Sequence, residues 1–430
     1  MTNLLVRKTK KLGGTVKAPP SKAYTHRALI AASLSEGQSL IEDALICDDT
    51  LVTIKACSML GAKIRKVTKG FKVDGVAKPI TPEGVIHCGD SGSTIRFMTP
   101  VFSLADGISV LTGNESLRRR PMEPLLVSLR QLGVQSHSTR ANGCPPMIVF
   151  GGGIKGGKTS IRGDISSQFI SGLLFGTPKA DTDTEIIVTT QLESKPYVTM
   201  TLNVLQSHGV EVGYPSDYSR FFVPCGQSYI PCNHLIEGDY SSAAFLLAAA
   251  FITDSRVKVA NLMKGTLQGD RIIFQIIEKM GADVNVGEDY VEVHGVRRGL
   301  KGVNVDLRDA PDLAPVCVVL ACFAQDETNI SGLKRLRFKE SDRLSSLHAE
   351  LKKMGAEIMV KEDGLVIRGP CKMHGTTIDS HNDHRIAMAC AIAALGANGE
   401  TTIQNSECVK KSYPTFFDDL RLLGADIVGW

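Results

Sequence analysis

Residues 271–286 read Arg271-Ile272-Ile273-Phe274-Gln275-Ile276-Ile277-Glu278-Lys279-Met280-Gly281-Ala282-Asp283-Val284-Asn285-Val286, and this stretch decides the fold. Its first part has the apolar periodicity of an amphipathic helix. Gly281 stands where a glycine in the left-handed conformation ends a helix. The alternating residues after it are typical of a strand. The stretch therefore predicts a helix, a glycine cap and a strand in direct succession.

A five-residue phrase with glycine in its second position, such as Met280-Gly281-Ala282-Asp283-Val284, occurs six times in the sequence. The six phrase glycines are Gly61, Gly133, Gly209, Gly281, Gly355 and Gly424. Neighbouring glycines are between 69 (424 − 355) and 76 (209 − 133) residues apart. Each unit also contains a more apolar helix, and apolarity on all sides predicts burial. These helices start near Ser21, Gly92, Ser166, Ser241, Pro311 and Asp383. Six units predict two domains of three repeats rather than a solenoid, whose repeats are usually about 20 to 50 residues long.

The composition points to a large protein of balanced charge. The chain has 430 residues, 43% of them hydrophobic, and a formal net charge of +4. It therefore predicts a large core and gives no reason to expect nucleic-acid or membrane partners. The eleven cysteines form no CxxC pair or zinc-type spacing, which predicts reduced thiols in a cytoplasmic protein and no metal.

Two apolar segments need a structural interpretation. Residues 4–6, Leu-Leu-Val, predict a short strand, because the N-terminal segment lacks the apolar region of a signal peptide. Residues 243–252 are too few to span a bilayer and predict a buried helix.

Basic residues recur where the apolar helices begin. Lys22, Arg27, Arg96 and Arg385 stand within or just after segments rich in Ser, Asp and Gly. One interpretation is that these segments only cap helices, which is the common use of such residues. Capping does not explain the cations, which are disfavoured at the positive end of the helix dipole unless an anion is present. The pattern therefore predicts anion sites at the helix starts.

Several separated motifs follow one another in a fixed order along the six repeats. They are Pro20-Ser21-Lys22 with Arg27, Gly92-Ser93 with Arg96, Arg120-Pro121, Ser166-Ser167-Gln168-Phe169, Ser194-Lys195-Pro196-Tyr197, Pro311-Asp312, Lys339-Glu340-Ser341-Asp342-Arg343-Leu344, Asn382-Asp383-His384-Arg385, and Cys408 with Lys411. Each motif alone is a weak signal. Together they resemble the 3-phosphoshikimate 1-carboxyvinyltransferase (EPSP synthase) family of enolpyruvyl transferases over the whole chain.

The resemblance implies an α/β (α+β) fold, a two-domain inside-out α/β barrel. Each domain has three βαβαββ repeats with buried parallel helices. One domain is expected at residues 22–235, and the other at residues 1–21 plus 236–430. The active site is expected in the cleft between them.

The resemblance also implies a reaction of the shikimate pathway, which makes chorismate and the aromatic amino acids. The enolpyruvyl group of phosphoenolpyruvate moves to the 5-hydroxyl of 3-phosphoshikimate by addition and elimination through a tetrahedral intermediate, and phosphate is released. Both substrates carry a phosphate and a carboxylate, which suits a cleft rich in Arg and Lys. The expected partners are these two small molecules, with no cofactor, and we expect a monomer.

The matching motif positions imply roles for individual residues. The expected catalytic residues are Asp312 as base toward the hydroxyl, Glu340 as proton donor toward the methylene, and Lys22, which shares in proton transfer. The expected phosphoenolpyruvate ligands are Lys22, Gly92, Arg120, Gln168, Arg343, Arg385 and Lys411. The expected 3-phosphoshikimate ligands are Lys22, Arg27, Ser166, Ser167, Gln168, Ser194, Tyr197, Asp312 and Lys339. For each residue the alternative is a solvated charge or a helix cap.

The sequence departs from the family pattern at some positions. Ala23 stands where the family normally has a serine that holds the shikimate phosphate, which predicts weaker affinity. Asp90-Ser91-Gly92-Ser93 replaces the common Asn-Ala-Gly-Thr, and Arg335 stands where some members have Asn. Sensitivity to the inhibitor glyphosate therefore does not follow from the resemblance.

Three other functions fit the sequence less well. A UDP-N-acetylglucosamine enolpyruvyl transferase typically carries a reactive cysteine near the position of Arg120, and residues 117–122 contain none. Residues 152–159 match the Walker A pattern of NTP-binding proteins, but residues 159–163 predict a strand and a turn instead of the required helix. A non-catalytic phosphate-binding module is disfavoured because Lys22, Asp312 and Glu340 are intact.

Overall fold

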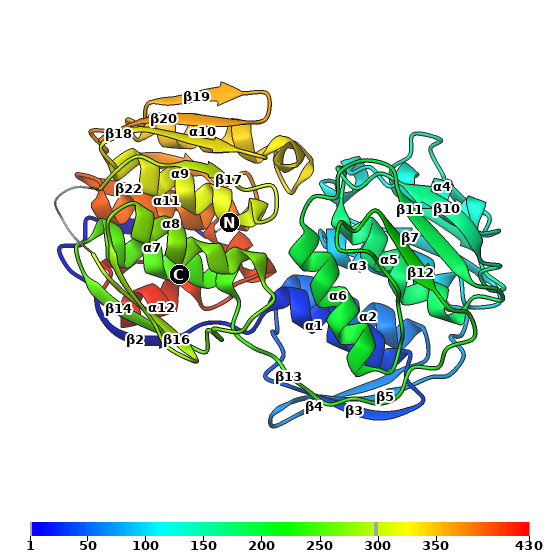
Figure 1. Cartoon of the computed structure of the whole chain (residues 1–430). Coiled ribbons are helices and arrows are strands. Elements are labelled where there is room, and N and C mark those ends of the chain that lie inside the picture. The colour runs from blue at the N-terminus through cyan, green and yellow to red at the C-terminus, as the bar shows by residue number, and fades with distance from the viewer. Residues whose placement is uncertain (1, 296–299, 430) are drawn as a thin grey trace. The chain divides into compact units, whose positions relative to one another are not determined.

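The computed structural model describes residues 2–295 and 300–429. The chain divides into two compact units (Figure 1). The continuous unit comprises Pro20–Ile236, and the discontinuous unit comprises Met1–Pro19 with Glu237–Trp430. The continuous unit thus begins at Pro20 and ends at Ile236, where the sequence predicted Lys22 and Leu235.

The continuous unit contains strands and helices in alternation. Its helices are α1 (Lys22–Ser33), α2 (Asp48–Met59), α3 (Gly92–Phe102), α4 (Glu123–Gln131), α5 (Ser167–Gly176) and α6 (Lys195–Ser207), with 3₁₀ helices η1 (Leu117–Arg119) and η2 (Thr177–Lys179). Its strands are β3 (Gly37–Glu42), β4 (Lys63–Val67), β5 (Gly70–Gly75), β6 (Ile86–His87), β7 (Ile108–Thr112), β8 (Ser136–Ser138), β9 (Met147–Phe150), β10 (Gly157–Ile161), β11 (Thr184–Val188), β12 (Arg220–Val223) and β13 (His234–Leu235).

The discontinuous unit is built in the same way. Its helices are α7 (Tyr240–Ile252), α8 (Ile273–Lys279), α9 (Ala314–Phe323), α10 (Arg343–Lys353), α11 (His384–Gly396) and α12 (Phe416–Leu422), with η3 (Gly269–Ile272), η4 (Pro311–Leu313), η5 (Lys334–Phe338) and η6 (Ser406–Lys411). Its strands are β1 (Leu4–Arg7), β2 (Gly13–Lys17), β14 (Arg256–Ala260), β15 (Asp283–Val286), β16 (Tyr290–His294), β17 (Asn304–Asp306), β18 (Asp326–Ser331), β19 (Ile358–Lys361), β20 (Gly364–Gly369), β21 (Thr377–Asp379), β22 (Glu400–Gln404) and β23 (Ile427–Val428).

Each unit has three separate sheets with one recurring strand order. The orders are β13-β3-β5-β4, β6-β7-β9-β8 and β10-β11-β12 in the continuous unit, and β15-β16-β14-β2, β17-β18-β20-β19 and β21-β22-β1-β23 in the discontinuous unit. In the sheet of β6 to β9, the first two strands are parallel and the others antiparallel. With α3 and α4 between strands, this repeat is the predicted βαβαββ unit. Closure of the sheets into a barrel stays a prediction.

Three strands join repeats that are distant in sequence. In the discontinuous unit, β1 pairs with both β22 and β23, and β2 pairs in parallel with β14. In the continuous unit, β13 pairs in parallel with β3. The predicted strand at residues 4–6 is confirmed as β1, and it ties the start of the chain to its last repeat.

The six phrase glycines all end helices as predicted. Their φ angles are positive: Gly61 105°, Gly133 85°, Gly209 75°, Gly281 107°, Gly355 94° and Gly424 100°. A strand follows five of them, and Asp283–Val286 forms β15 as expected. The prediction is wrong after Gly209, where residues 210–212 form no strand and only Gly213 makes an isolated bridge with Phe222. Pro215 follows closely, and proline cannot donate to a strand ladder.

The apolar helices α1, α3, α5, α7, α9 and α11 form the interior of the units. In the discontinuous unit α7, α9 and α11 contact one another (Figure 1), and every residue of 240–251 in α7 is buried. In the continuous unit α3 contacts both α1 and α5. Side chains cap five of the six helices; the capping residues are Ser21, Ser91, Ser166, Asp239 and Asp383. Over the described part of the chain, none of the helices combines the length and apolarity needed to cross a bilayer.

The Walker A match leads into a strand. Gly157–Ile161 form β10, which is followed by a turn and not by a helix. A P-loop needs a helix N-terminus directly after the glycine-rich turn. The NTP-binding alternative is therefore rejected.

Candidate functional site

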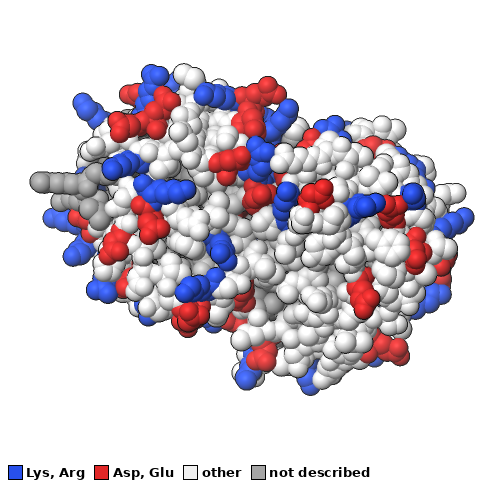
Figure 2. Space-filling model, in the orientation of Figure 1, with Lys and Arg blue, Asp and Glu red and all other residues white. Residues whose placement is uncertain are grey.

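Six basic residues of the motifs are buried, unlike most Lys and Arg of the chain. Figure 2 shows basic and acidic side chains interspersed over the visible surface. The exposed fractions of the six are 2% for Arg27, 7% for Arg96, 5% for Arg120, 2% for Arg343, 3% for Arg385 and 7% for Lys411. Burying a charge costs several kcal/mol unless it is paired. Solvated surface charge therefore does not explain these residues, which form one cluster in each unit.

Arg27 lies on α1 and is surrounded by neutral groups. Its Nε donates to Oγ1 of Thr201, and its Nη1 and Nη2 donate to the carbonyl oxygens of Ala23 and Tyr197, each at 2.8 Å. The guanidinium also stacks over the ring of Phe97. No carboxylate among the described residues forms an ion pair with Arg27. Burial lowers the pKa of Arg27 to about 10, so the cation is held in a site where an anion would stabilise it.

The starts of α3 and α5 are joined through Arg96 and Gln168. Nη1 of Arg96 donates to Oε1 of Gln168 at 2.9 Å and to Oγ of Ser166 at 3.3 Å. Nε2 of Gln168 donates to Oγ of Ser93 at 2.8 Å. Ser166 also caps α5 by accepting from the backbone N–H of Gln168. The N-termini of two buried helices therefore lie together, as the sequence predicted.

Gly92 leaves room for an arginine at the start of α3. A Cβ atom at this position would lie 2.7 Å from Nη1 of Arg120, 3.7 Å from Oε1 of Gln168 and 3.8 Å from Nη1 of Arg96. The structure therefore brings Gly92, Arg120 and Gln168 together, in line with their expected common ligand. Any side chain at this position would have to displace the guanidinium of Arg120.

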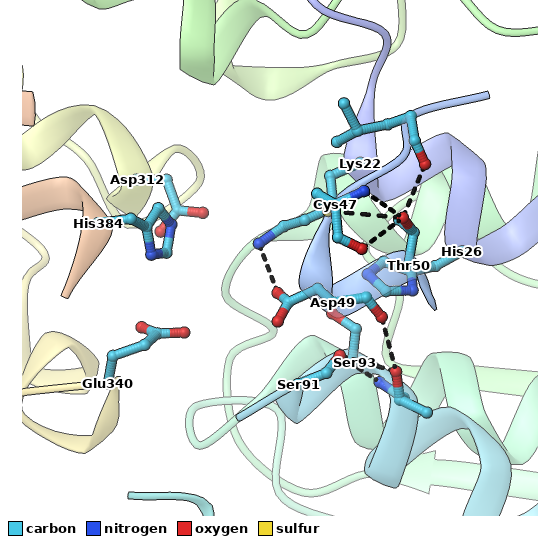
Figure 3. A network of polar contacts seen from close by, with 12 residues as sticks. Lys22, His26, Cys47, Asp49, Thr50, Ser91, Ser93, Asp312, Glu340 and His384 are labelled. Atoms are coloured by element: carbon cyan, nitrogen blue, oxygen red, sulfur yellow. Dashed lines mark hydrogen bonds and ion pairs between the residues drawn. The ribbon is translucent and has the colours of Figure 1, made fainter. Parts of the chain in front are cut away.

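Lys22 is held by an acid that the sequence analysis did not single out. Its Nζ lies 2.8 Å from Oδ2 of Asp49, which stands in the first turn of α2 (Figure 3). The Lys22 and Asp49 side chains are 19% and 9% exposed. Asp48 precedes Asp49 and is exposed. The two acids point in different directions from α2, and this direction decides which of them faces Lys22.

A buried polar chain supports this region. Nδ1 of His26 lies 2.7 Å from Oγ1 of Thr53, which lies 2.6 Å from Oγ1 of Thr94. Thr94 donates to Oγ of Ser91, the cap of α3. Burial and the charges of Lys22 and Arg27 lower the pKa of His26 well below 6.5, so the imidazole is neutral near pH 7. This chain of hydrogen bonds links α1, α2 and α3 without adding a charge.

Ser194 and Tyr197 lie at the start of α6. Ser194 is 3% exposed and has a left-handed backbone with φ of 56°, which is strained for a residue with a Cβ. The carbonyl of Tyr197 accepts from Arg27. Ser167 is buried in the first turn of α5. All predicted ligands before residue 200 thus lie in the continuous unit, at the starts of α1, α3, α5 and α6 and just before α4.

In the discontinuous unit, Arg343 joins three carboxylates. It lies 2.9 Å from Asp383, 2.9 Å from Asp312 and 2.7 Å from Glu340, and its side chain is 2% exposed. Burial by itself would lower the pKa of Arg343, but the charges of Asp383, Glu340 and Asp312 outweigh burial and raise it. These contacts use all of its N–H donors except one on Nη1.

Asp312 lies among three cations. Its Oδ1 lies 2.9 Å from Arg343 and 3.5 Å from Nζ of Lys339, and its Oδ2 lies 3.5 Å from Nη2 of Arg385. Burial lowers the pKa of Lys339 to about 8, although the charge of Asp312 opposes this shift. The predicted residues Asp312, Lys339 and Arg343 are therefore brought into direct contact.

Arg385 ties the start of α11 to α7. Its Nη1 and Nη2 donate to the carbonyl and hydroxyl oxygens of Ser241 at 2.9 and 2.7 Å. Within the described chain, its buried Nε has no hydrogen-bond partner. Nζ of Lys411 donates to the carbonyl oxygen of Asn382 at 2.7 Å, beside the start of the same helix. Both cations thus stand where a helix N-terminus already favours an anion.

Asp49, Asp383 and Ser241 hold three of the predicted cations but were not themselves predicted as site residues. Asp383 is completely buried, caps α11 and accepts from Arg343. The signal for Asp383 was present, because it stands inside a quoted motif. For Asp49 and Ser241 the sequence shows only common helix-start residues.

The two clusters can bind anions and move protons. Buried guanidinium groups bind phosphate and carboxylate strongly, and Asp312 and Glu340 supply carboxylates beside them. Among the described residues, no group of three or more His, Cys, Asp or Glu side chains is arranged to hold a metal ion.

Comparison with known proteins gives consistent matches. The chain matches the family model described as EPSP synthase (3-phosphoshikimate 1-carboxyvinyltransferase) over residues 6–420. It is 44% identical over 427 residues to the 3-phosphoshikimate 1-carboxyvinyltransferase of Methanococcus vannielii, with 99% of each chain covered. It is 45% identical to the protein of that name from Methanocaldococcus jannaschii over the same length and coverage.

Solved structures are similar over the whole length. The EPSP synthase of Acinetobacter baumannii has a TM-score of 0.83 and 27% identity, with 100% of each chain covered. The enolpyruvyl transferase NikO of Streptomyces tendae has a TM-score of 0.80, covering 100% of this chain and 99% of that chain, and its 20% identity supports the fold alone.

Proposed function

The chain belongs to the EPSP synthase (3-phosphoshikimate 1-carboxyvinyltransferase) family, and from this premise we propose how its two clusters carry out the reaction. The enzyme is a transferase of the shikimate pathway. It moves the enolpyruvyl group of phosphoenolpyruvate to the 5-hydroxyl of 3-phosphoshikimate and releases phosphate.

The observation that carries the proposal is the burial of Arg27 without a compensating acid among the described residues. Arg27 is 2% exposed and donates only to neutral oxygens among the described residues. An arrangement of this kind costs folding free energy, so it is better explained by a ligand than by stability. A phosphate carries about −1.5 to −2 charges at neutral pH and offers three acceptor oxygens.

We assign phosphoenolpyruvate to cations from both clusters. Its ligands are Lys22, Gly92, Arg120 and Gln168 in the continuous unit, and Arg343, Arg385 and Lys411 in the discontinuous unit. The open donors on Nε of Arg385 and on Nη1 of Arg343 support this assignment. Gly92 contributes by its lack of a side chain, which lets a ligand approach the backbone and Arg120.

We assign 3-phosphoshikimate to the helix starts of the continuous unit and to two residues of the discontinuous unit. Its ligands are Lys22, Arg27, Ser166, Ser167, Gln168, Ser194, Tyr197, Asp312 and Lys339. Hydroxyl groups and helix N–H groups at these starts suit a phosphate. Ala23 supplies no hydroxyl, and its carbonyl instead accepts from Arg27.

The proton transfers are assigned to three side chains. Asp312 takes the proton of the attacking 5-hydroxyl, and Glu340 gives a proton to the methylene carbon of phosphoenolpyruvate. Addition produces a tetrahedral intermediate, from which phosphate leaves as a methyl proton is removed. Lys22, held by Asp49, shares in these transfers and neutralises the leaving phosphate.

The proposal requires both clusters to serve one pair of substrates, in the cleft between the units that the family resemblance predicts. The test is phosphate release by the purified full chain. Release is expected only when phosphoenolpyruvate and 3-phosphoshikimate are present together, and Arg27→Met in one unit and Arg385→Met in the other should each abolish it. Release with either substrate alone, or its absence with both, would contradict the proposal.

The related reaction on UDP-N-acetylglucosamine is not favoured. The relatives over the full length carry the name 3-phosphoshikimate 1-carboxyvinyltransferase, and η1 before Arg120 contains no cysteine. The same phosphate assay with UDP-N-acetylglucosamine as acceptor should give no signal. A cytoplasmic location and a monomer stay predictions, which cell fractionation and light scattering would test.

A further inference from the structure

Two of the free cysteines lie next to each other in the discontinuous unit, away from the motif residues. Cys322 is in the last turn of α9 and is completely buried, whereas Cys371, just after β20, is partly exposed. The backbone N–H of Cys371 donates to the carbonyl of Cys322 at 2.8 Å. This bond satisfies the carbonyl of Cys322 at the C-terminal end of α9 and holds the segment after β20 against that helix.

The geometry of this pair suits a disulfide. The backbone hydrogen bond joins the two residues directly, and disulfides need Cα atoms only about 4.4–6.8 Å apart. Each thiol shifts the pKa of the other, which places the two side chains close together. Little backbone movement is therefore needed to join the sulfur atoms.

The two thiols differ in acidity. The hydrogen bond from the Cys322 thiol, with help from the backbone N–H of Glu357 and against the effect of burial, lowers the pKa of Cys371 to about 7. The same hydrogen bond, with burial, raises the pKa of Cys322 well above 9.0. Cys371 is thus the more acidic thiol of the pair and the one that can supply a thiolate near neutral pH.

Small solutes can reach Cys371. Cys371 is partly exposed, and its neighbours Glu357 and Arg368 line a surface hollow of about 200 Å³ together with Ile358, Met359 and Val366. Two of these residues contact its sulfur, since Glu357 donates a backbone N–H to Sγ at 3.4 Å and the protonated Cys371 thiol donates to the Arg368 carbonyl at 3.2 Å. Cys322 has no such access because it is buried.

We propose that Cys371 and Cys322 form a reversible disulfide site that reacts with peroxides. The Cys371 thiolate attacks hydrogen peroxide, the O–O bond breaks, and the products are Cys371 sulfenic acid and hydroxide. The Cys322 thiol then attacks the sulfenic sulfur, the S–S bond forms, and the sulfenic oxygen leaves as water after taking up the thiol proton. Overall, two thiols are oxidised and one peroxide is reduced to two waters.

The disulfide would close a loop that carries part of the candidate site. Residues 323–370 lie between the two cysteines and include Lys339, Glu340 and Arg343. Cross-linking a loop reduces the entropy of the unfolded chain. The oxidised protein is therefore expected to unfold at a higher temperature than the reduced protein.

The first experiment needs no mutation. The full chain is treated with limiting hydrogen peroxide at pH 7, blocked with iodoacetamide and mapped by mass spectrometry without reduction. The expected product is a peptide pair linked through Cys322 and Cys371, lighter by two hydrogens and restored by dithiothreitol. Sulfinic acid at Cys371 with an intact Cys322 thiol, or a disulfide between other cysteines, would overturn the proposal.

Cys225 provides a matched control. It is more exposed than Cys371, but a hydrogen bond with Asp183, together with burial and the charge of that acid, raises its pKa above 9.0. In the untreated reduced protein at pH 7, iodoacetamide should therefore modify Cys371 before Cys225. Faster modification of Cys225 would contradict the thiolate assignment.

Variants separate the two roles. Cys371→Ser should prevent the peroxide-dependent disulfide and leave phosphate release unchanged, whereas Cys225→Ser should leave the disulfide intact. Cys322→Ala should stop oxidation at a sulfenic acid on Cys371, which dimedone traps. A disulfide that persists in Cys371→Ser would overturn the proposal. Cys322→Ala changes a buried residue. If this variant does not fold, the disulfide mapping of the unmodified chain is the deciding test of the proposal.

Discussion

Nζ of Lys22 lies 2.8 Å from Oδ2 of Asp49, and this ion pair joins the first turns of α1 and α2. The contact fixes the position of a lysine that is expected to meet both substrates. It also explains how a cation is held at a helix N-terminus, where the dipole disfavours it.

Asp49→Asn should therefore lower kcat. The amide keeps the shape of the side chain but loses the charge that orients Lys22, and a hydrogen bond to a charged group contributes about 1.5–3 kcal/mol, or about ten- to a hundredfold in rate. Steady-state phosphate release measures the effect. Asp48→Asn changes the exposed neighbour and should behave as the unmodified enzyme; equal losses in both variants would exclude the positioning role.

Arg27→Lys should raise KM for 3-phosphoshikimate by about tenfold or more, with a smaller effect on KM for phosphoenolpyruvate. Lysine keeps the charge but cannot reproduce the planar fork that reaches Thr201, Ala23 and Tyr197. Arg65→Lys, at an exposed ion pair with Asp74, is the control and should change neither KM. An unchanged KM in Arg27→Lys would remove Arg27 from the ligand set.

Gly92→Ala should weaken phosphoenolpyruvate binding without unfolding the protein. The new methyl group would lie 2.7 Å from Nη1 of Arg120, so the guanidinium must move, while alanine favours the helix. The expected result is a higher KM for phosphoenolpyruvate at an unchanged melting temperature. Gly84→Ala, which meets no atom within 4 Å, is the matched control. Identical kinetics in the two variants would count against the Arg120 assignment.

Asp312→Asn should lower kcat far more than it changes KM for either substrate. The asparagine can still contact its neighbours but cannot take a proton from the hydroxyl, so the loss falls on the transition state. Rapid-quench measurement of the chemical step would detect it. Asp306→Asn, an exposed acid paired with Arg308, should leave the rate unchanged. A parallel rise in KM without a loss of kcat would assign Asp312 to binding only.

Binding of 3-phosphoshikimate should weaken as pH rises through about 8. The folded-state pKa of Lys339 is lowered to about 8, so the cation is present below this pH and is lost above it. The unfolded chain keeps its proton up to about 10.5, so this lysine costs the folded state stability below pH 8, and the cost decreases between pH 8 and 10.5.

A pH profile of KM for 3-phosphoshikimate checks this prediction. The profile should bend near pH 8 in the unmodified enzyme and stay flat there in Lys339→Arg, because arginine keeps its charge. A bend that remains in Lys339→Arg would point to another group.

Much of the fold could be predicted because each repeat is marked by local features of the sequence, namely an amphipathic helix and a glycine that ends it. A glycine that ends a helix needs a positive φ, and all six phrase glycines have one. The missing strand after Gly209 could not be predicted from the phrase alone, since pairing depends on the partner strand and on the turn at Pro215. The strand partners of β1 and β2 are also long-range features, set by sheets completed hundreds of residues later.

The site was predictable as a set of residue types but not as a network. The motif positions led to cations that are buried, such as Arg27 and Arg385, and their roles as ligands stay predictions. The groups that hold them come from elsewhere: Ser241 is 144 positions away from Arg385. Such a partner follows only from the packing of α7 against α11, which no local pattern encodes.

The pairing of β1 and β2 sets an order of events during biosynthesis. By the time the ribosome has added Leu235, every strand of the continuous unit has been made, including the closing strand β13. The ladders of β2 and β1 can form only after their partner strands have been synthesised, which are β14 for β2 and β22 and β23 for β1. The segment β1–β2 thus leaves the exit tunnel before the units form but is among the last to reach its native neighbours, and a nascent chain truncated before residue 400 lacks both strands that pair with β1.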